Sequence, residues 1–229
     1  MAPMNETASI LLGSLPYLLY GTLNTALIVF AAMFIGLFIG TCCACGLVYG
    51  PRPLQLVLRA YLWFFRGVPI LVLLFLFYYG LFTYLNVKIN ALAAVSIVLG
   101  LTTGAYQANI FRGAMLSLPA GQFKAACALG MSTPQAIISI ILPQTLRLSI
   151  PAWSNEYSII LKDSALAFVI GAPEIMARTQ FVASRTYQHL PLYLSAGLLY
   201  FLLTWLGVAL LRRLETKMRI PGYSEQGMT

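Results

Sequence analysis

A run of 45 consecutive uncharged residues near the N-terminus constrains this chain more than any other feature. About 20 mainly apolar residues are enough to cross the hydrocarbon core of a bilayer as a helix. From Thr7 to Pro51 the sequence contains no Asp, Glu, Lys or Arg. Only 9% of all 229 residues are charged, whereas a soluble domain carries roughly a quarter. We therefore expect an integral membrane protein with a single transmembrane domain over residues 1–229.

Four further apolar stretches follow the first, so the sequence predicts an all-α membrane protein with five transmembrane helices. Glycines and prolines such as Gly50 and Pro51 separate the first stretch from the second. Inside the first stretch, Gly36 and Gly40 have a spacing that lets a second helix approach closely. Glycine is also simply common in membrane helices, so both interpretations stand. The four later spans cover approximately residues 54–84, 89–111, 144–161 and 192–211.

The basic residues predict the orientation, because short cytoplasmic connections are enriched in Lys and Arg. With five spans, four bases lie on one side, namely Lys88, Lys162, Arg178 and Arg185. Ten bases lie on the other side: Arg52, Arg59, Arg66, Arg112, Lys124, Arg147, Arg212, Arg213, Lys217 and Arg219. We therefore expect the N-terminus outside and the C-terminus in the cytoplasm. The connection over residues 113–142 is then cytoplasmic.

Several function classes lack the residues that they need. The net charge of +8 is explained by topology, so we expect membrane lipid and no nucleic acid as a partner. Cys42 and Cys45 have CxxC spacing, but no further ligand lies near them and the one histidine is His189. Packing between helices is the expected role of these cysteines, and we expect no metal. No phosphate loop, HExxH or GxSxG occurs, so we expect no ATP binding, no other cofactor and no catalytic residue in this chain. The first apolar run is also too long for a cleavable signal.

The connection over residues 113–142 has the pattern of two short helices with a sharp turn between them. Leu118 to Gly121 form a turn, and an alanine-rich helix is expected over residues 122–129. Gly130 suits a helix end with positive φ. Ser132 or Thr133 is expected to cap a second helix with Pro134 at its first position, and this helix runs to about residue 142, before Pro143. Such a knob either docks into a groove on a soluble partner or is only an interfacial connection.

The spacing within this connection resembles the EAA loop of bacterial ABC importer permeases. Ala125-Ala126 is followed by three residues, Gly130, nine residues and Ile140-Ile141-Leu142-Pro143. The resemblance implies a cytoplasmic coupling helix that inserts into a separate ATPase subunit, which binds the ATP. Lys124 stands where the family usually has glutamate, which changes the charge offered to the ATPase. The coupling residues that the resemblance implies are Lys124, Ala125, Ala126, Gly130, Met131 and Pro143.

More of the chain, over roughly residues 15–213, is similar to the polar amino acid permeases of the histidine, glutamine, arginine and opine type. The sequences Phe65-Arg66-Gly67-Val68-Pro69 and Ser154-Asn155-Glu156 carry this similarity. Leu73 and Asn109 depart from the family, since many members have glutamine and glutamate there. The resemblance implies a non-catalytic membrane subunit of an importer in the bacterial inner membrane. Its implied partners are two ATPase subunits, a second permease subunit, the same or related, and an extracytoplasmic amino-acid-binding protein.

Glu156 is the residue most suggestive of a substrate site. It lies about halfway through the fourth span and has no basic residue within one helical turn. An ionised carboxylate inside a membrane is unfavourable unless it faces a wet cavity or a partner. It either binds a cationic group of the substrate, with Asn155 and Ser158 beside it, or makes a hydrogen bond between helices. Pro69, with Gly67 beside it, is expected to break the second span, a frequent device at transporter substrate sites.

Three functions fit these features to different degrees. The first is an ATP-driven importer subunit for polar amino acids, with a preference for cationic ones because of Glu156. The second is an ion-coupled secondary transporter that uses Glu156, although no inverted repeat is seen. The third is a membrane scaffold, which gives no reason for a broken helix and an intramembrane acid. Polar residues of the third span, Thr103 and Gln107 among them, either line a path or bond neighbouring helices.

Overall fold

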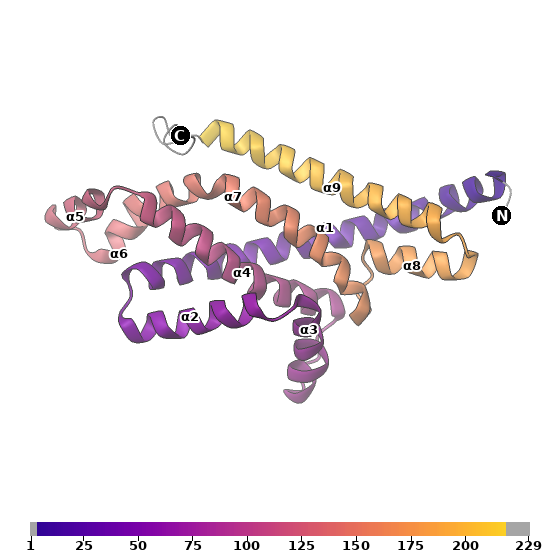
Figure 1. Ribbon diagram of the computed structural model, residues 1–229, viewed down its shortest axis with the longest axis horizontal. Helices are drawn as coiled ribbons and strands as arrows, with labels where there is room; N and C mark the ends of the chain where they lie inside the picture. The colour runs from indigo at the N-terminus through magenta and orange to yellow at the C-terminus, as the bar shows by residue number, and fades with distance from the viewer. Residues whose placement is uncertain (1–3, 219–229) are drawn as a thin grey trace.

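The computed structural model describes residues 4–218, and within that range it is helical and contains no strand. The expected all-α architecture is therefore confirmed. Long helices lie roughly side by side, with α5 and α6 at one end of the molecule and α8 towards the other (Figure 1). Two π-helical segments, η1 and η2, and one 3-10 segment, η3, interrupt the α-helices. In chain order the elements are α1 (Met4–Tyr49), α2 (Arg52–Gly67), α3 (Ile70–Phe75), η1 (Leu76–Phe82), α4 (Ala91–Ser117), α5 (Ala120–Ala128), α6 (Thr133–Ala136), η2 (Ile137–Ile141), α7 (Leu142–Asp163), η3 (Ser164–Ile170), α8 (Ile175–Thr186) and α9 (His189–Met218).

Four helical stretches are long and apolar enough to cross a membrane, and a bent pair makes a fifth if it counts as one span. The pair consists of α2 and the helix over Ile70–Phe82, which meet at 107°. With the bent pair counted as one span, five apolar units correspond to the five predicted spans, and the number that cross the membrane stays a prediction. Their orientation relative to the membrane stays a prediction, and Arg219, one of the ten bases counted for it, lies outside the described residues. The four single stretches are Thr7–Tyr49, Ala91–Ser117, Thr133–Ile170 and His189–Met218.

The break in the second span lies where Pro69 predicts it. A residue before proline is driven out of the helical region, because the proline ring collides with its backbone. Val68 accordingly has φ −95° and ψ 131°, and Pro69 is the N-cap of α3. Figure 1 shows α3 projecting away from the layer of helices that contains α1, α2 and α4. The first part of this span, α2, therefore runs beside α4, and the second part turns steeply away from it.

The predicted ends of two other spans are wrong. The third span was expected to end before Arg112, but α4 continues to Ser117. The exposed Arg112 side chain does not need to leave the helix, and Pro119 provides the stop shortly afterwards. The fifth span, expected over residues 192–211, is α9 from His189 to Met218. Its basic last turns continue the helix because Lys and Arg are good helix formers outside the apolar region.

The second helix of the connection does not end at Pro143, as the sequence had suggested. Instead α6, η2, α7 and η3 form one continuous helical stretch, Thr133–Ile170. Proline lacks an N–H and normally disrupts the regular bonding of a helix interior. Here the π-helical turn η2 directly precedes α7, whose first turn contains Pro143, and this turn replaces the regular bonding at that point. The second half of the connection over residues 113–142 is thus a direct extension of the fourth span.

The central packing is the contact between α1 and α4, and glycines make it possible. A Cβ atom on Gly36 would lie 2.6 Å from Gln107 Nε2 and from Thr103 Cγ2. A Cβ on Gly40 would lie 2.8 Å from Gln107 Cβ. On the other helix, a Cβ on Gly100 would be 2.7 Å from Ile35 Cγ2. The close-approach interpretation of the GxxxG spacing is therefore confirmed, and small residues let two backbones pack tightly.

We expect Gly36→Val to destabilise the folded protein by about 1–3 kcal/mol, because overpacking a tight contact forces neighbouring groups apart. Thermal unfolding of the purified chain in detergent, followed by gel filtration, measures the effect. Gly13→Val is the matched control, since Gly13 lies in the same helix and has no neighbour within 4 Å of an added Cβ. Equal melting temperatures for the two variants would contradict the proposed packing role.

Candidate functional site

The turn after α5 is held by a specific pattern of backbone hydrogen bonds. The N–H of Gly130 donates to the carbonyl of Cys127 at 3.0 Å, and the N–H of Met131 donates to that of Ala126 at 3.1 Å. These two bonds form a Schellman motif, in which the residue after the helix has positive φ. Gly130 has φ +87°, so the expected positive φ is confirmed. The turn fixes the direction in which α5 points relative to α6.

The bounds of the two short helices differ slightly from those expected. The first begins at Ala120 rather than at residue 122, because Pro119, with φ −57° and ψ 122°, lies outside the helical region and is the N-cap. Ser132 is the N-cap of α6, and its N–H donates to the side-chain oxygen of Gln135 at 2.9 Å. Pro134 is therefore the second residue of this helix rather than the first.

Side chains connect this loop to the long helices. The rings of Phe123 and Tyr49 have centroids 4.9 Å apart, which joins α5 to the end of α1. Gln144 Nε2 donates to Gln122 Oε1 at 2.8 Å, which joins α5 to α7. No sequence pattern indicates these contacts, because they depend on the angle at which α5 folds back. The helix α5 is therefore attached directly to two long apolar helices, α1 and α7.

The surface of the loop over residues 113–142 combines small and apolar side chains with hydroxyl and amide groups, and Lys124 is its one charged residue. Lys124 and Ala125 are exposed, and Leu129 is 86% exposed. Gly130 and Pro143 are also exposed, whereas Ala126 is buried and Met131 is half-buried. The structure thus presents four of the six predicted coupling residues at the surface and turns Ala126 towards the protein.

Glu156 lies inside the packing of α1, α4 and α7. It is 4% exposed, and Thr103 Oγ1 donates to its Oε1 at 2.6 Å. The chain of bonds continues: Gln107 Nε2 donates to Thr103 Oγ1 at 3.2 Å, and Trp153 Nε1 donates to Gln107 Oε1 at 2.7 Å. Thr103 and Gln107 therefore bond helices together in this structure. A buried acid with a hydrogen-bond partner matches the interhelical interpretation of Glu156 in this conformation.

The other predicted substrate residues are not gathered around Glu156. Asn155 is exposed on a different side of α7, together with Ala152 and Ile159. Ser158 is half-buried, and its hydroxyl donates to the carbonyl of Ser154 at 3.3 Å. Pro69 is exposed at the break between α2 and α3. The predicted set is thus divided between the interior and the outer face of the helices.

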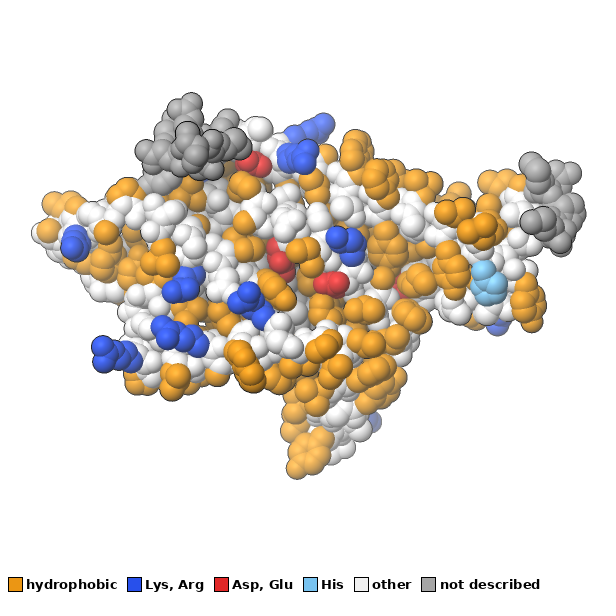
Figure 2. Space-filling view, viewed as in Figure 1, with side chains coloured by type: hydrophobic (Ala, Val, Ile, Leu, Met, Phe, Trp, Pro, Cys, Tyr) orange, Lys and Arg blue, Asp and Glu red, His pale blue; other side chains and the backbone are white. Residues whose placement is uncertain are grey.

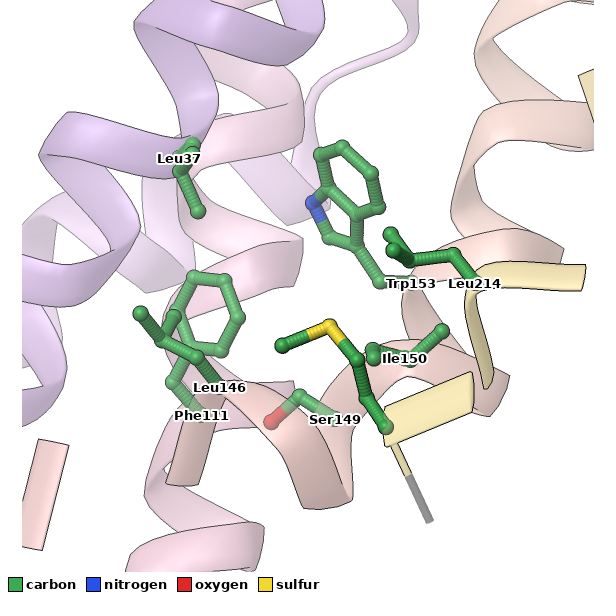
Figure 3. Close-up of a pocket in the computed structure, with 8 residues that line it drawn as sticks. Leu37, Phe111, Leu146, Ser149, Ile150, Trp153 and Leu214 are labelled. Carbon is green, nitrogen blue, oxygen red and sulfur yellow. The ribbon is translucent and has the colours of Figure 1, made fainter. Parts of the chain in front are cut away.

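A cavity of about 240 Å³ lies next to this hydrogen-bond chain. It is almost entirely apolar, and Ser149 is the polar residue in its lining. Figure 3 shows the ring of Trp153 at one end of it, with Phe111 and Leu37 on one side and Leu214 of α9 on the other. Its apolar walls do not suit a zwitterionic amino acid, which needs paired polar groups when it is buried.

A second buried acid, Glu174, holds α8 against the rest of the protein. Its side chain accepts from the N–H groups of Met176 at 2.7 Å and Ala177 at 2.6 Å, and from the hydroxyl of Tyr200 in α9. Burial raises the pKa of the Glu174 carboxyl, while these hydrogen bonds act to lower it. Arg178 reaches α1, where its guanidinium lies 4.3 Å from the ring centroid of Tyr17. The sequence analysis did not identify the role of Glu174 as the N-cap of α8, because glutamate is not among the residues usually preferred at that position.

Comparison with known proteins agrees with this architecture. The family model described as "Binding-protein-dependent transport system inner membrane component" matches residues 32–220. A probable amino-acid ABC transporter permease of Bacillus subtilis, YckA, is 34% identical over 204 residues, covering 89% of this chain and 90% of that protein. The histidine/lysine/arginine/ornithine transport system permease HisM of Escherichia coli is 33% identical over 210 residues, covering 88% of each. The octopine transport permease OccQ of Rhizobium radiobacter is 31% identical over 211 residues, covering 87% of this chain and 89% of that protein.

Solved structures show the same fold. An amino acid ABC transporter crystallised with histidines matches with a TM-score of 0.79 and 30% identity, covering 90% of this chain and 96% of that one. The inward-facing MetNI methionine ABC transporter matches with a TM-score of 0.77 at 19% identity, which is a likeness of fold. With a family match over residues 32–220 and relatives similar along almost their whole length, the chain belongs to the binding-protein-dependent transport system inner membrane components and is an ABC permease of the bacterial inner membrane.

Proposed function

We propose that this permease is the membrane subunit of an ATP-driven importer for polar amino acids that an extracytoplasmic binding protein delivers. The observation that carries the proposal is the exposed, tightly fixed α5–α6 loop. Its Schellman turn holds α5 in one direction, and its surface residues, such as Leu129, have no cover within the described chain. A short helix of this kind fits a groove on a soluble ATPase subunit.

The loop is also built to transmit movement. The contacts Phe123–Tyr49 and Gln122–Gln144 attach it to α1 and α7, and α7 carries Glu156. A shift of α5 by the ATPase would therefore displace α7 against α4. Such a displacement is needed for substrate to reach Glu156, because its carboxylate is buried against Thr103. The proposed cycle thus exposes the acid in one conformation and covers it in another.

The relatives support the substrate class. HisM is named for histidine, lysine, arginine and ornithine, and OccQ for octopine. All of these carry an ammonium or a guanidinium group, for which a carboxylate such as Glu156 is a suitable ligand. The proposed assembly contains two permease subunits, of the same or a related chain, and two ATPase subunits that bind the ATP. An ion-coupled transporter is disfavoured because YckA and HisM, two relatives of similar length, are components of amino acid transport systems of the ABC permease family.

We expect no ATP hydrolysis by the purified permease alone, and hydrolysis that responds to substrate-loaded binding protein once the ATPase subunit is added. The reason is that the sequence contains no phosphate loop. Phosphate release from proteoliposomes measures this, and co-purification of the ATPase with a tagged permease is the simpler first test. Hydrolysis by the ATPase-free chain, or failure to bind any ATPase encoded beside it, would overturn the proposed function.

A further inference from the structure

A second cavity, of about 420 Å³, lies between α2 and α4 and is lined by three arginines. Arg59 and Arg66 come from α2, and Arg112 comes from α4. Asn109 and Trp63 complete its polar edge. In Figure 2, basic side chains gather on the part of the molecule that contains α2 and α5. We call these three arginines the arginine cluster.

Among the described residues, no acidic side chain neutralises the positive charge of the arginine cluster. No Asp or Glu lines the cavity, and within residues 4–218 none of the three arginines makes an ion pair. Arg59 donates to Gln55 at 3.4 Å, and Arg66 lies 5.3 Å from the ring centroid of Tyr106. Both contacts are with neutral groups. The cluster therefore leaves three guanidinium groups available to an anion.

The arginine cluster extends well beyond the start of α2. Arg66 is 14 residues from Arg52 at the start of α2, a rise of about 21 Å along a helix. Its neighbour Tyr106 is 11 residues from Ser117 at the end of α4, so the two residues are separated by about 16 Å along the helix axis. With α2 as the first part of the predicted second span, Arg66 would lie within the membrane, where an arginine is unfavourable in hydrocarbon and marks a water-filled cavity or a path. Trp63, at the mouth, is 80% exposed.

We propose that the arginine cluster lines a water-filled vestibule that attracts the carboxylate group of the transported amino acid. A guanidinium binds a carboxylate with two parallel hydrogen bonds, and three of them concentrate anions in a narrow space. The substrate's ammonium end would be bound elsewhere, so the two charged ends of one zwitterion have separate ligands. This proposal rests on the proposed function, because it takes an amino acid as the cargo.

The positive electrostatic potential of the vestibule is tested with two thiol reagents of opposite charge. The parent protein for this test has Ala in place of its four cysteines, Cys42, Cys43, Cys45 and Cys127. It carries one new cysteine, introduced as Trp63→Cys, and is reconstituted with its ATPase in liposomes. The probes are an anionic sulfonatoethyl and a cationic trimethylammonioethyl methanethiosulfonate, each normalised to its reaction with a free thiol in solution. We expect the anionic reagent to react about tenfold faster at low salt, with the difference falling as salt rises.

Charge variants assign the effect to the cluster. Asn109→Glu adds a carboxylate to the lining, and Arg59→Gln with Arg112→Gln removes two charges, so both changes should abolish the preference for the anionic reagent. Arg185→Gln is the matched control, because Arg185 lies on α8, outside this lining, and it should leave the preference unchanged. An equal rate for the two reagents in the parent protein would overturn the proposal. Reaction with membrane-permeant N-ethylmaleimide alone would also overturn it and would place Trp63 in lipid.

A transport measurement connects the vestibule to the cargo. In the complex with native cysteines, Arg66→Gln should raise the KM for L-arginine or L-glutamine, whichever is transported, by about fivefold or more. Arg66→Lys keeps the positive charge and should return the KM most of the way to the value of the unchanged protein. An unchanged KM for Arg66→Gln would overturn the carboxylate role. The labelling experiment does not depend on transport. If the permease binds its ATPase but the two reagents react at equal rates, the vestibule is rejected and the proposed function is unaffected. A complex that binds no ATPase rejects the proposed function first.

Discussion

Replacing Glu156 with Gln is expected to weaken substrate binding in the membrane subunit by about 1–3 kcal/mol, the contribution of a hydrogen bond to a charged group. This corresponds to about a 5- to 150-fold loss. Glutamine keeps the size of the side chain and keeps an oxygen that can accept from Thr103 Oγ1. Only the charge is removed, so the contact between α4 and α7 is retained. Substrate binding to the reconstituted complex and uptake into proteoliposomes measure the loss.

Thr103→Val is the matched control for this variant. It removes the hydroxyl that donates to Glu156, keeps the side-chain shape and leaves the charge in place. We expect Thr103→Val to lower thermal stability more than substrate affinity, and Glu156→Gln to do the reverse. Assays with L-arginine and L-glutamine then locate the contact: equal loss indicates the α-ammonium, and selective loss of arginine indicates its side chain. Undiminished transport of both by Glu156→Gln would end the hypothesis of a substrate contact.

Replacing Gly130 with Val is expected to uncouple ATP hydrolysis from transport while the protein still inserts into the membrane. A β-branched residue at φ +87° is strained by about 1–2 kcal/mol. The strain is relieved if the turn opens, which breaks the bonds from Gly130 to Cys127 and from Met131 to Ala126. The helix α5 then no longer points in a fixed direction. We expect the amount of amino acid transported per ATP to fall by about tenfold, the equivalent of 1.4 kcal/mol.

Two variants isolate the conformational cause. Gly121→Val lies within α5, has no neighbour within 4 Å of an added Cβ and needs no positive φ, so it should transport normally. Gly130→Asn should recover much of the coupling, because asparagine tolerates the left-handed region. Normal transport per ATP by a well-expressed Gly130→Val protein would show that the turn is not needed for coupling.

Local chemistry explains what could be predicted from the sequence. The break before α3 and the turn after α5 depend on single residues, Pro69 and Gly130, whose backbone preferences hold in almost any surroundings. The number of long apolar stretches followed from the spacing of charges, because the bilayer excludes unpaired charge over a known thickness. Pro143 was the exception. Its usual effect on a helix was overridden by the π-helical turn before it, which no local pattern had indicated.

Only the tertiary structure decided which of the predicted substrate residues are buried and which are exposed. Asn155 and Glu156 are adjacent in sequence, yet one is exposed and the other is buried against Thr103. In a soluble helix the apolar side marks the packed side, but here both lipid and protein interior accept apolar residues, so hydrophobicity does not distinguish them.

The sequence by itself determined that this is a membrane permease with a broken second span and a sharply turned loop between the third and fourth spans. Tertiary structure alone decided which polar groups meet. Arg66 and Arg112 are far apart in sequence and share one cavity because α2 packs along α4, where Tyr61 donates to the carbonyl of Leu101 at 2.5 Å. Glu174 likewise acquires Tyr200 as a partner only when α9 returns beside α8. Such contacts depend on the angles between helices, which are set by the packing of whole faces and not by any single residue.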